Sequence, residues 1–213
     1  MHDEIMAVHA VMWRASDLIR AALKRLRDDG IGELATILST GHWFARFVQQ
    51  HYESDDELLW PILHRSFPES SDEIESLARQ HIQLMELLDD LALGLRMLKR
   101  IGRRTDGAEV REARAVLAVA SEVHSMLENL LETETFILGR MLARSSSEDI
   151  RRLRGALIHN VPRSRPSLLL GLMQDPQPCA GADALLVNLP IGVRLCRPIL
   201  LRLYWRRIRR LEA

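Results

Sequence analysis

The sequence predicts an all-α protein, in which an up-down four-helix bundle is followed by a small C-terminal region of short helices. Hydrophobic residues recur with the 3.6-residue period of an amphipathic helix through four long stretches between residues 3 and 144. Only 5% of the residues are aromatic, whereas Leu, Ala, Arg and Glu are abundant, which is typical of packed helices. With 213 residues, 47% of them hydrophobic, the chain can bury one good core.

The first two stretches are separated by a glycine. The first runs from Asp3 to Asp29 and stops at Gly30, a residue that favours the end of a helix. The second runs from Glu33 to about Arg65. Within it, Pro61 lacks a backbone donor and is expected to bend the last turn.

The third and fourth stretches are both long and both begin with capping signals. The third covers residues 70–102 and the fourth residues 106–143. Asp106 and Glu109 form the pattern of a capping box at the start of the fourth, and an equivalent pair opens the third. The turns between the four helices are short, so neighbouring helices are expected to be antiparallel.

The chain changes character after the fourth helix, which predicts a bundle domain over residues 1–144 and a basic helical extension over residues 145–213. Ser145–Glu148 is expected to end one helix and cap the next. Five of the eight prolines then fall between residues 162 and 190, which predicts short helices ending in a longer one from Pro190 to Leu211. Cys179 and Cys196 are expected to be small buried residues without a disulfide.

The formal net charge of zero hides a difference between the two regions. Residues 1–144 carry a net charge of −7 and residues 145–213 carry +7. The simplest interpretation is that the basic extension packs on the acidic bundle. The alternative is that the Arg-rich C-terminus, where Tyr204 and Trp205 accompany the arginines, contacts an anionic partner or a membrane surface. Nucleic-acid binding is not expected, because no groove-reading motif accompanies the charge.

The two ends of the sequence predict neither a secretory signal nor a membrane span. Met1–Glu4 is polar and acidic, and no apolar segment follows a basic start, so a secretory signal is not expected. The longest uncharged run near the C-terminus, from Ala184 to Val193, is too short to span a bilayer. These features predict a cytoplasmic protein without a transmembrane helix.

Histidines and carboxylates recur in the four predicted helices with the spacing of metal ligands. His51 and Asp55 are four residues apart, so on a helix they project from one face, where two ligands can share a metal. The same spacing returns in the fourth helix, and the two remaining long helices each contribute one histidine. The candidate ligands are His9, His51, Asp55, His81, His124 and Glu128.

The distances of these residues from the turns indicate that they can meet inside the bundle. In an antiparallel pair, ligands at one height lie about equally far from the turn that joins their helices. His9 and His51 lie equally far from Gly30 along the chain, one before it and one after it. The largest mismatch is five residues, for His81 and His124 around Thr105, which corresponds to about 7 Å along a helix.

Two other kinds of metal site are excluded by the sequence. A ferritin-like centre requires Glu-x-x-His pairs, and no glutamate has a histidine three residues after it. A structural zinc site favours thiolates in a closed tetrahedron, which the positions of Cys179 and Cys196 do not offer.

These motifs resemble those of the hemerythrin-like, or HHE cation-binding, family. The stretch from His51 to Pro61 is similar to the second-helix signature of that family, and His124–Glu128 to its fourth-helix signature. The resemblance covers about residues 3–144. It implies an up-down four-helix bundle with a cofactor of two non-haem irons, oxo- or hydroxo-bridged, for which His9, His51, His81 and His124 would be terminal ligands and Asp55 and Glu128 bridging carboxylates. Met85 stands where hemerythrins proper carry a further histidine.

The resemblance also implies a function. The leading hypothesis is a protein that binds O2, or a related small oxidant such as peroxide or nitric oxide, at an open iron position for sensing, storage or detoxification. Two alternatives stay open: an enzyme that disproportionates peroxide or acts as an oxidase at the same centre, and a metal-free helical scaffold that mediates interactions. The C-terminal extension resembles that of some actinobacterial members of the family.

Overall fold

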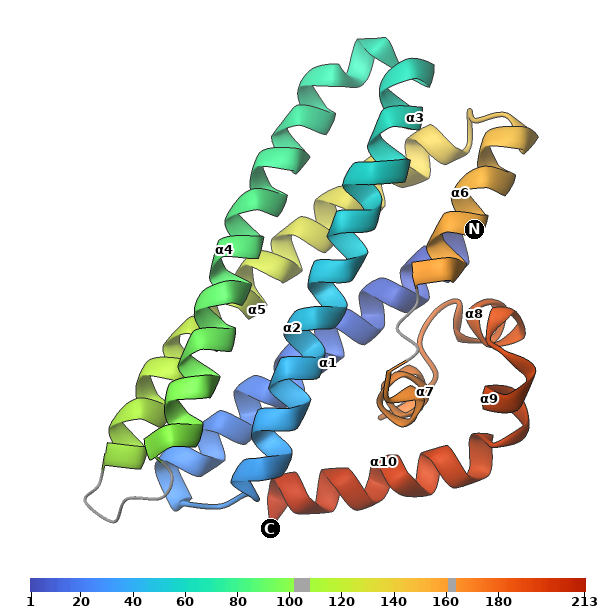
Figure 1. Ribbon diagram of the computed structural model, residues 1–213. Coiled ribbons are helices and arrows are strands. Elements are labelled where there is room, and N and C mark those ends of the chain that lie inside the picture. Colours follow the sequence, from blue (N-terminus) through green and yellow to red (C-terminus); the bar gives the residue numbers. More distant parts are fainter. Residues whose placement is uncertain (102–107, 161–163) are drawn as a thin grey trace.

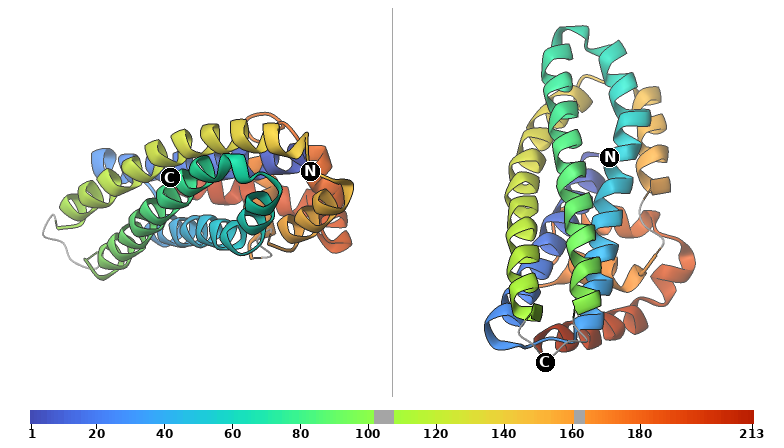
Figure 2. Two further views of the ribbon diagram at one scale, coloured as in Figure 1. Left: turned by 90° about the horizontal axis from the view of Figure 1, so that it is seen from above. Right: turned by 60° about the vertical axis from the view of Figure 1, so that its left-hand side comes forward.

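Four long helices form the up-down bundle that the sequence predicts. The computed structural model describes residues 1–101, 108–160 and 164–213, in which the regular structure is helical (Figure 1). Helices α1, α2, α4 and α5 are the four members, and each packs against two of the others in the cyclic order α1, α2, α4, α5. Figure 2 shows the bundle from above and from one side, with the remaining helices against one flank. The bundle consists of α1 (His2–Asp29), α2 (Leu34–Ser54), α4 (Ser71–Ile101) and α5 (Ala108–Leu142).

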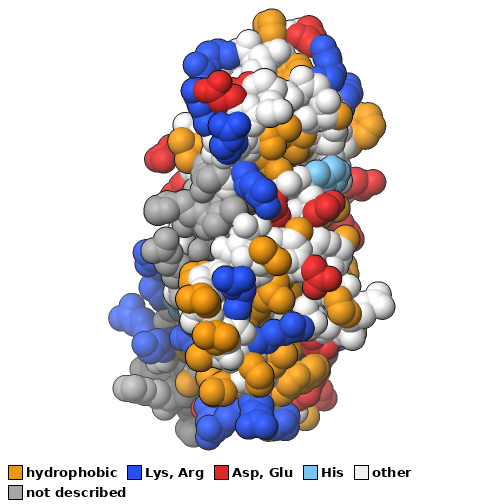
Figure 3. All heavy atoms as spheres, turned by 90° about the vertical axis from the view of Figure 1, so that its right-hand side faces the viewer, with side chains coloured by type: hydrophobic (Ala, Val, Ile, Leu, Met, Phe, Trp, Pro, Cys, Tyr) orange, Lys and Arg blue, Asp and Glu red, His pale blue; other side chains and the backbone are white. Residues whose placement is uncertain are grey.

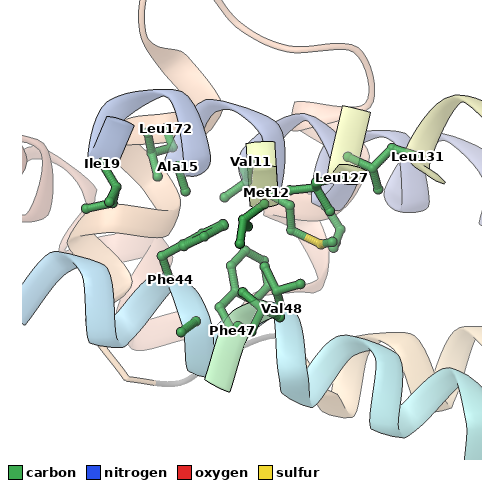
Figure 4. Packing of buried hydrophobic residues seen from close by; sticks show 14 of the residues in the cluster. Val11, Met12, Ala15, Ile19, Phe44, Phe47, Val48, Leu127, Leu131 and Leu172 are labelled. Carbon is green, nitrogen blue, oxygen red and sulfur yellow. The ribbon is translucent and has the colours of Figure 1, made fainter. Parts of the chain in front are cut away.

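The bundle encloses one continuous hydrophobic core. Val11, Met12 and Ala15 of α1 point towards Phe44 and Phe47 of α2, and leucines of α5 close the same space (Figure 4). These side chains are at most a few per cent exposed, so folding removes most of their apolar surface from water. Burial of one large aliphatic or aromatic side chain stabilises the folded protein by about 1.5–3 kcal/mol. The core therefore fixes how the four helices are rotated about their axes.

A π-helical turn interrupts the second long helix of the bundle. The segment η1 (Asp55–Leu59) follows α2 and leads into α3 (Trp60–Ser66). The backbone N–H of Trp60 donates to the carbonyl oxygen of Asp55, one residue further than in an α-helix. Pro61 cannot donate to the carbonyl of Glu57 and its ring crowds that group, which favours a wider turn just before it. The bend expected at Pro61 thus takes the form of a π segment.

The chain then turns back over Phe67 and enters α4 through η2 (Pro68–Ser70), a short 3-10 helix.

The cap expected after α5 is confirmed, because the hydroxyl oxygen of Ser146 accepts a hydrogen bond from the backbone N–H of Asp149 at 3.1 Å. The predicted capping box of Asp106 and Glu109 lies outside the described residues.

The C-terminal region packs on α1 and α2 as a second layer of short helices. It consists of α6 (Ser147–Asn160), α7 (Pro166–Gln174), α8 (Ala182–Asn188), α9 (Ile191–Leu195) and α10 (Arg197–Glu212). Helix α10 lies across the end of the bundle (Figure 1), where the backbone N–H of Glu33 donates to the carbonyl oxygen of Arg210 at 2.8 Å. Tyr204 is 1% exposed and covers Gly171 of α7, which has no side chain to oppose the ring.

Two expectations about this region are wrong. The last helix does not run without a break from Pro190, because the chain leaves helical geometry at Cys196 between α9 and α10. Pro198, in the first turn of α10, cannot bond to the carbonyl of Arg194, so a continuous helix is disfavoured. Cys196 is exposed rather than buried, whereas Cys179 is buried, and neither cysteine forms a disulfide.

No helix in the described part of the chain combines the length and the apolar run that crossing a bilayer requires.

Candidate metal centre

Five titratable side chains from all four bundle helices meet in the interior near the π turn. His9 comes from α1, His51 from the end of α2, Asp55 from the first position of η1, His81 from α4 and Glu134 from α5. All five side chains belong to buried residues, with relative exposures between 0% for Glu134 and 8% for Asp55. A buried cluster of this kind is costly unless its members are paired or bind a cation.

Glu134 is at the middle of the cluster. One of its carboxylate oxygens, Oε1, lies 2.7 Å from Nε2 of His81, and the other, Oε2, lies 3.5 Å from Nε2 of His9. His9, His51 and Glu134 each offer a donor atom within 4.8 Å of the donor atoms of the other two. Nε2 of His51 also lies 3.4 Å from Oδ2 of Asp55.

The unpaired atoms in this cluster fit a metal cation. Nε2 of His9, Nε2 of His51 and Oε2 of Glu134 are buried and have no hydrogen-bond partner within the described protein. Buried polar atoms are normally satisfied, so three unsatisfied ones that converge need an explanation. Imidazole nitrogen and carboxylate oxygen are together the donors that first-row transition metals accept, which makes a bound cation the simplest explanation.

The contact of His9 with Thr135 favours the tautomer of His9 that can bind a metal. Nδ1 of His9 lies 3.4 Å from the hydroxyl oxygen of Thr135, and that hydroxyl donates to the sulfur of Met6 at 3.6 Å. Because the hydroxyl proton is directed at sulfur, the hydroxyl oxygen accepts the proton of Nδ1. Nε2 of His9 then carries a free lone pair towards Glu134, as in many metal sites where a second group orients the ligand.

Burial shifts the pKa values of the cluster in opposite directions. It lowers the pKa of His9 and that of His51 to about 3, because an imidazolium is disfavoured away from water. Burial also raises the pKa of Asp55 well above its ordinary value, and the nearby charge of Glu134 raises it further. Two uncharged imidazoles beside two carboxylates that repel each other form a site in which a cation relieves the repulsion.

His81 differs from the other two histidines because it lies between carboxylates. Burial alone would lower its pKa, but the carboxylates of Asp56 and Glu134 beside it outweigh burial and raise the pKa of His81 to about 9. Its ring is held between Tyr52 and Trp60, with centroid distances of 4.2 and 5.6 Å. These two aromatic rings and the carboxylates fix the position of His81.

A small cavity opens beside the cluster. It has about 20 Å³ of room for the centre of a water molecule, and the polar part of its wall includes His9, His51 and Asp55. A cavity of this size holds about one water molecule or another ligand of two or three heavy atoms. The apolar part of the wall comes from α1, the π turn, α5 and α6, namely Ile5, Leu58, Leu59, Leu138 and Leu153.

The structure brings together four of the six candidate ligands. It brings His9, His51, Asp55 and His81 together, but it does not bring His124 or Glu128 to them. His124 is half-buried between α1 and α5, where Nδ1 lies 2.8 Å from the hydroxyl of Ser16. It is ten residues before Glu134, about 15 Å along α5. Glu128 is exposed and points away from the bundle interior.

Glu134 takes the place in the cluster that was expected for Glu128, and the sequence contains a signal for it. The buried positions of α5 include Leu127, Leu130, Leu138 and Met141, which form the stripe that faces the core. Glu134 falls within that stripe at helical spacing, so its carboxylate must be buried when the helix packs. A charged residue inside an apolar stripe is rare unless it is paired or binds a metal.

We expect the metal-free protein to lose stability as the pH falls from about 6.5 towards 3. The folded pKa of His9 and of His51 is about 3, below the ordinary value of 6.5, so in this window the unfolded chain binds protons that the folded chain excludes. Each histidine contributes a slope of up to about 1.4 kcal/mol per pH unit to the free energy of unfolding. Asp55, whose pKa is raised, opposes part of this slope.

Urea unfolding at several pH values measures the effect. The His9→Leu variant should show a shallower pH dependence than the wild type, whereas His64→Ala, a change at a histidine outside the cluster, should not alter it. Identical slopes for wild type and His9→Leu would contradict the burial of a neutral imidazole at position 9.

The comparisons with known proteins agree with this geometry. The family model described as the hemerythrin HHE cation binding domain matches residues 1–138, which include α1, α2, α4 and nearly all of α5. No curated protein matches the chain. No solved structure matches it either. The match covers more than half of the chain and contains all five clustered residues, and the chain therefore belongs to the hemerythrin HHE cation-binding domain family.

Proposed function

We propose that this protein binds iron in the cluster of His9, His51, Asp55, His81 and Glu134 and that the bound iron takes up O2 or a related small oxidant, peroxide or nitric oxide. The observation that carries the proposal is the convergence of three unpaired buried donor atoms, from His9, His51 and Glu134, in an interior otherwise closed by apolar side chains. A family of cation-binding domains gives the same expectation.

The donor set supports iron in particular. Two imidazoles and one carboxylate, with positions left open, are the donor set of many non-haem Fe(II) sites. His81 and Asp55 add a third imidazole and a second carboxylate beside it, which is why we propose two irons rather than one. A metal held by Nε2 of His81 would take the place of the proton that this atom shares with Glu134.

The cavity favours a very small external ligand. It has about 20 Å³ of room for the centre of a water-sized molecule, which suits a diatomic gas or peroxide. Much of its wall is apolar, and the aromatic rings of Tyr52 and Trp60 pack against the ring of His81. The burial of Tyr52 and the charge of Glu134 raise the pKa of its phenol, so Tyr52 stays protonated and neutral beside the carboxylates.

Metal analysis combined with absorption spectroscopy tests the proposal. Protein purified from iron-supplemented medium should contain about two irons per chain, and its spectrum should change reversibly when O2 or nitric oxide is added and removed. One iron per chain would restrict the centre to His9, His51 and Glu134 and overturn the two-iron proposal. Absence of any metal would favour the alternative of a metal-free scaffold.

A separate assay distinguishes binding from catalysis. If the iron-loaded protein consumes peroxide over many turnovers, the centre acts as a peroxide-disproportionating enzyme. If the spectrum changes with the added ligand but no turnover follows, the protein binds or senses its ligand. The comparison needs the Glu134→Gln variant as a control for iron bound elsewhere on the chain.

A further inference from the structure

The C-terminal region exposes a row of hydrophobic side chains. From α8 to α10, a hydrophobic residue recurs at every fourth position, and all five members of this row are exposed, by 47–75%. Together with Trp205 they make up six of the thirteen large hydrophobic residues that are exposed in the described part of the chain, although they all come from one short segment near the C-terminus. We call this row the α8–α10 patch; it consists of Val187, Ile191, Leu195, Ile199 and Leu203.

The same segment is strongly and uniformly positive. Between Ala184 and Leu211 the sequence contains seven arginines and no acidic residue. Figure 3 looks onto this side of the molecule, and in its lower half the basic and hydrophobic side chains are intermingled. Arg194 lies between Ile191 and Leu195, and Arg202 is next to Leu203, so positive charge lies directly beside the exposed apolar groups.

Most of this charge is not neutralised by the bundle. Among the described residues, Arg210 is the one arginine of the seven that forms an ion pair with a carboxylate, at 3.6 Å from Glu33. Arg207 donates to the hydroxyls of Ser39 and Thr40, at 3.0 and 3.1 Å, and Arg197 to the side-chain oxygen of Gln174. Tyr204 packs within the extension, against Gly171 of α7, and the remaining arginines are exposed.

We propose that the α8–α10 patch docks on the surface of a bilayer that contains anionic lipids. Exposed aliphatic side chains with arginines around them are the features of a segment that lies in the membrane interface: the apolar groups enter the acyl boundary and the guanidinium groups bind lipid phosphates. A second copy of this chain is a poor occupant, because two such patches would face each other with like charges and no acidic residues to pair them.

One end of the patch is linked to a wall of the cavity. Asn188, next to Val187, donates to Oε1 of Glu4 at 2.7 Å, and Arg154 donates to the same oxygen at 2.8 Å. Glu4 is one residue before Ile5, which lines the cavity beside His9. Docking through α8 would therefore bring the first turn of α1 and this wall of the cavity near the lipid surface. The inference about the membrane does not depend on which metal or small ligand the bundle binds.

Co-sedimentation with lipid vesicles tests the proposal on the full chain. We expect binding to vesicles of phosphatidylcholine mixed with phosphatidylglycerol, weaker binding at high salt, and little binding to phosphatidylcholine alone. The Arg194→Gln/Arg202→Gln variant should bind the anionic vesicles roughly 30-fold more weakly, since each arginine near the surface contributes about fivefold. The Ile191→Ser/Leu195→Ser variant should lose at least about tenfold. All four substituted residues are exposed, so the variants are expected to fold normally.

Matched changes on the bundle provide the control. The Leu93→Ser/Arg111→Gln variant removes one exposed hydrophobic residue and one exposed arginine from α4 and α5, and it should bind the vesicles as the wild type does. Equal binding by wild type and both patch variants would overturn the proposal, as would absence of binding to anionic vesicles. If the chain instead forms a dimer that Ile191→Ser/Leu195→Ser converts to a monomer, with no vesicle binding, the patch is a self-association surface and the proposal is wrong.

Discussion

We expect the Glu134→Gln variant to lose most of its bound metal. The glutamine keeps the shape of the side chain and an oxygen that can accept from His81, but it removes the negative charge that lies nearest to His9 and His81. Loss of groups that only orient metal ligands weakens binding about 10–100-fold, so loss of the central carboxylate should cost more than about 100-fold. Metal content after dialysis against a weak chelator, together with an absorption spectrum, measures the effect.

Two neighbouring changes on the same helix show whether the effect is specific. Glu128→Gln alters an exposed carboxylate and His124→Ala alters a histidine bonded to Ser16, and neither should change the metal content by more than about twofold. Loss of the metal in His124→Ala or Glu128→Gln, but not in Glu134→Gln, would contradict the cluster described here. The centre would then have to lie about two to three turns earlier along α5.

The Gly181→Ala variant should be destabilised by more than about 3 kcal/mol. Gly181 has a φ of +74°, and a Cβ added to it would overlap the backbone carbonyl of Asp3 in α1. A positive φ alone is unfavourable for alanine, but a collision with backbone cannot be relieved by a rotamer change and forces α8 away from α1. Urea unfolding gives the change in the free energy of unfolding, and hydrogen exchange should show loss of protection in α7 to α10.

Two other glycines separate the causes of this effect. Gly30 has a similar positive φ of +64° but open space around it, so Gly30→Ala should cost only about 1 kcal/mol. Gly192 is free of both constraints, and Gly192→Ala should be close to neutral. If Gly181→Ala were no more harmful than Gly30→Ala, the close approach of α8 to Asp3 would not be a feature of the protein in solution.

The sequence predicts the helical architecture well where a helix end has a local cause. Gly30 ends α1 with a left-handed residue, and Ser146 caps α6 with its hydroxyl. The π turn was harder to predict, since Pro61 indicates a distortion but not its form. The break at Cys196 was missed because hydrophobic periodicity continues across it, and only the lost hydrogen bond at Pro198 distinguishes two helices from one.

The site was predicted in part because its members obey different rules. His51 and Asp55 share one helix face, and His9 lies as far from Gly30 as His51 does, so local spacing predicts these three. For α5 the height argument favours Glu128 over Glu134. His81 is 24 positions before Thr105, whereas Glu128 is 23 positions after it and Glu134 is 29 positions after it. Only the rotation of α5, which the core leucines set, selects Glu134.

The contacts at Glu4 join the part of the chain that the family model matches to the part that follows it. The family match ends at residue 138, yet Arg154 and Asn188, both beyond it, bind the carboxylate of Glu4, and Leu153 completes the wall beside His9 and His51. The portion matched by the family model supplies the donor atoms, whereas the portion after it contributes Leu153 to the wall beside them. Two proteins that share the matched portion but differ in their tails would thus present the same donor atoms beside cavities with different walls.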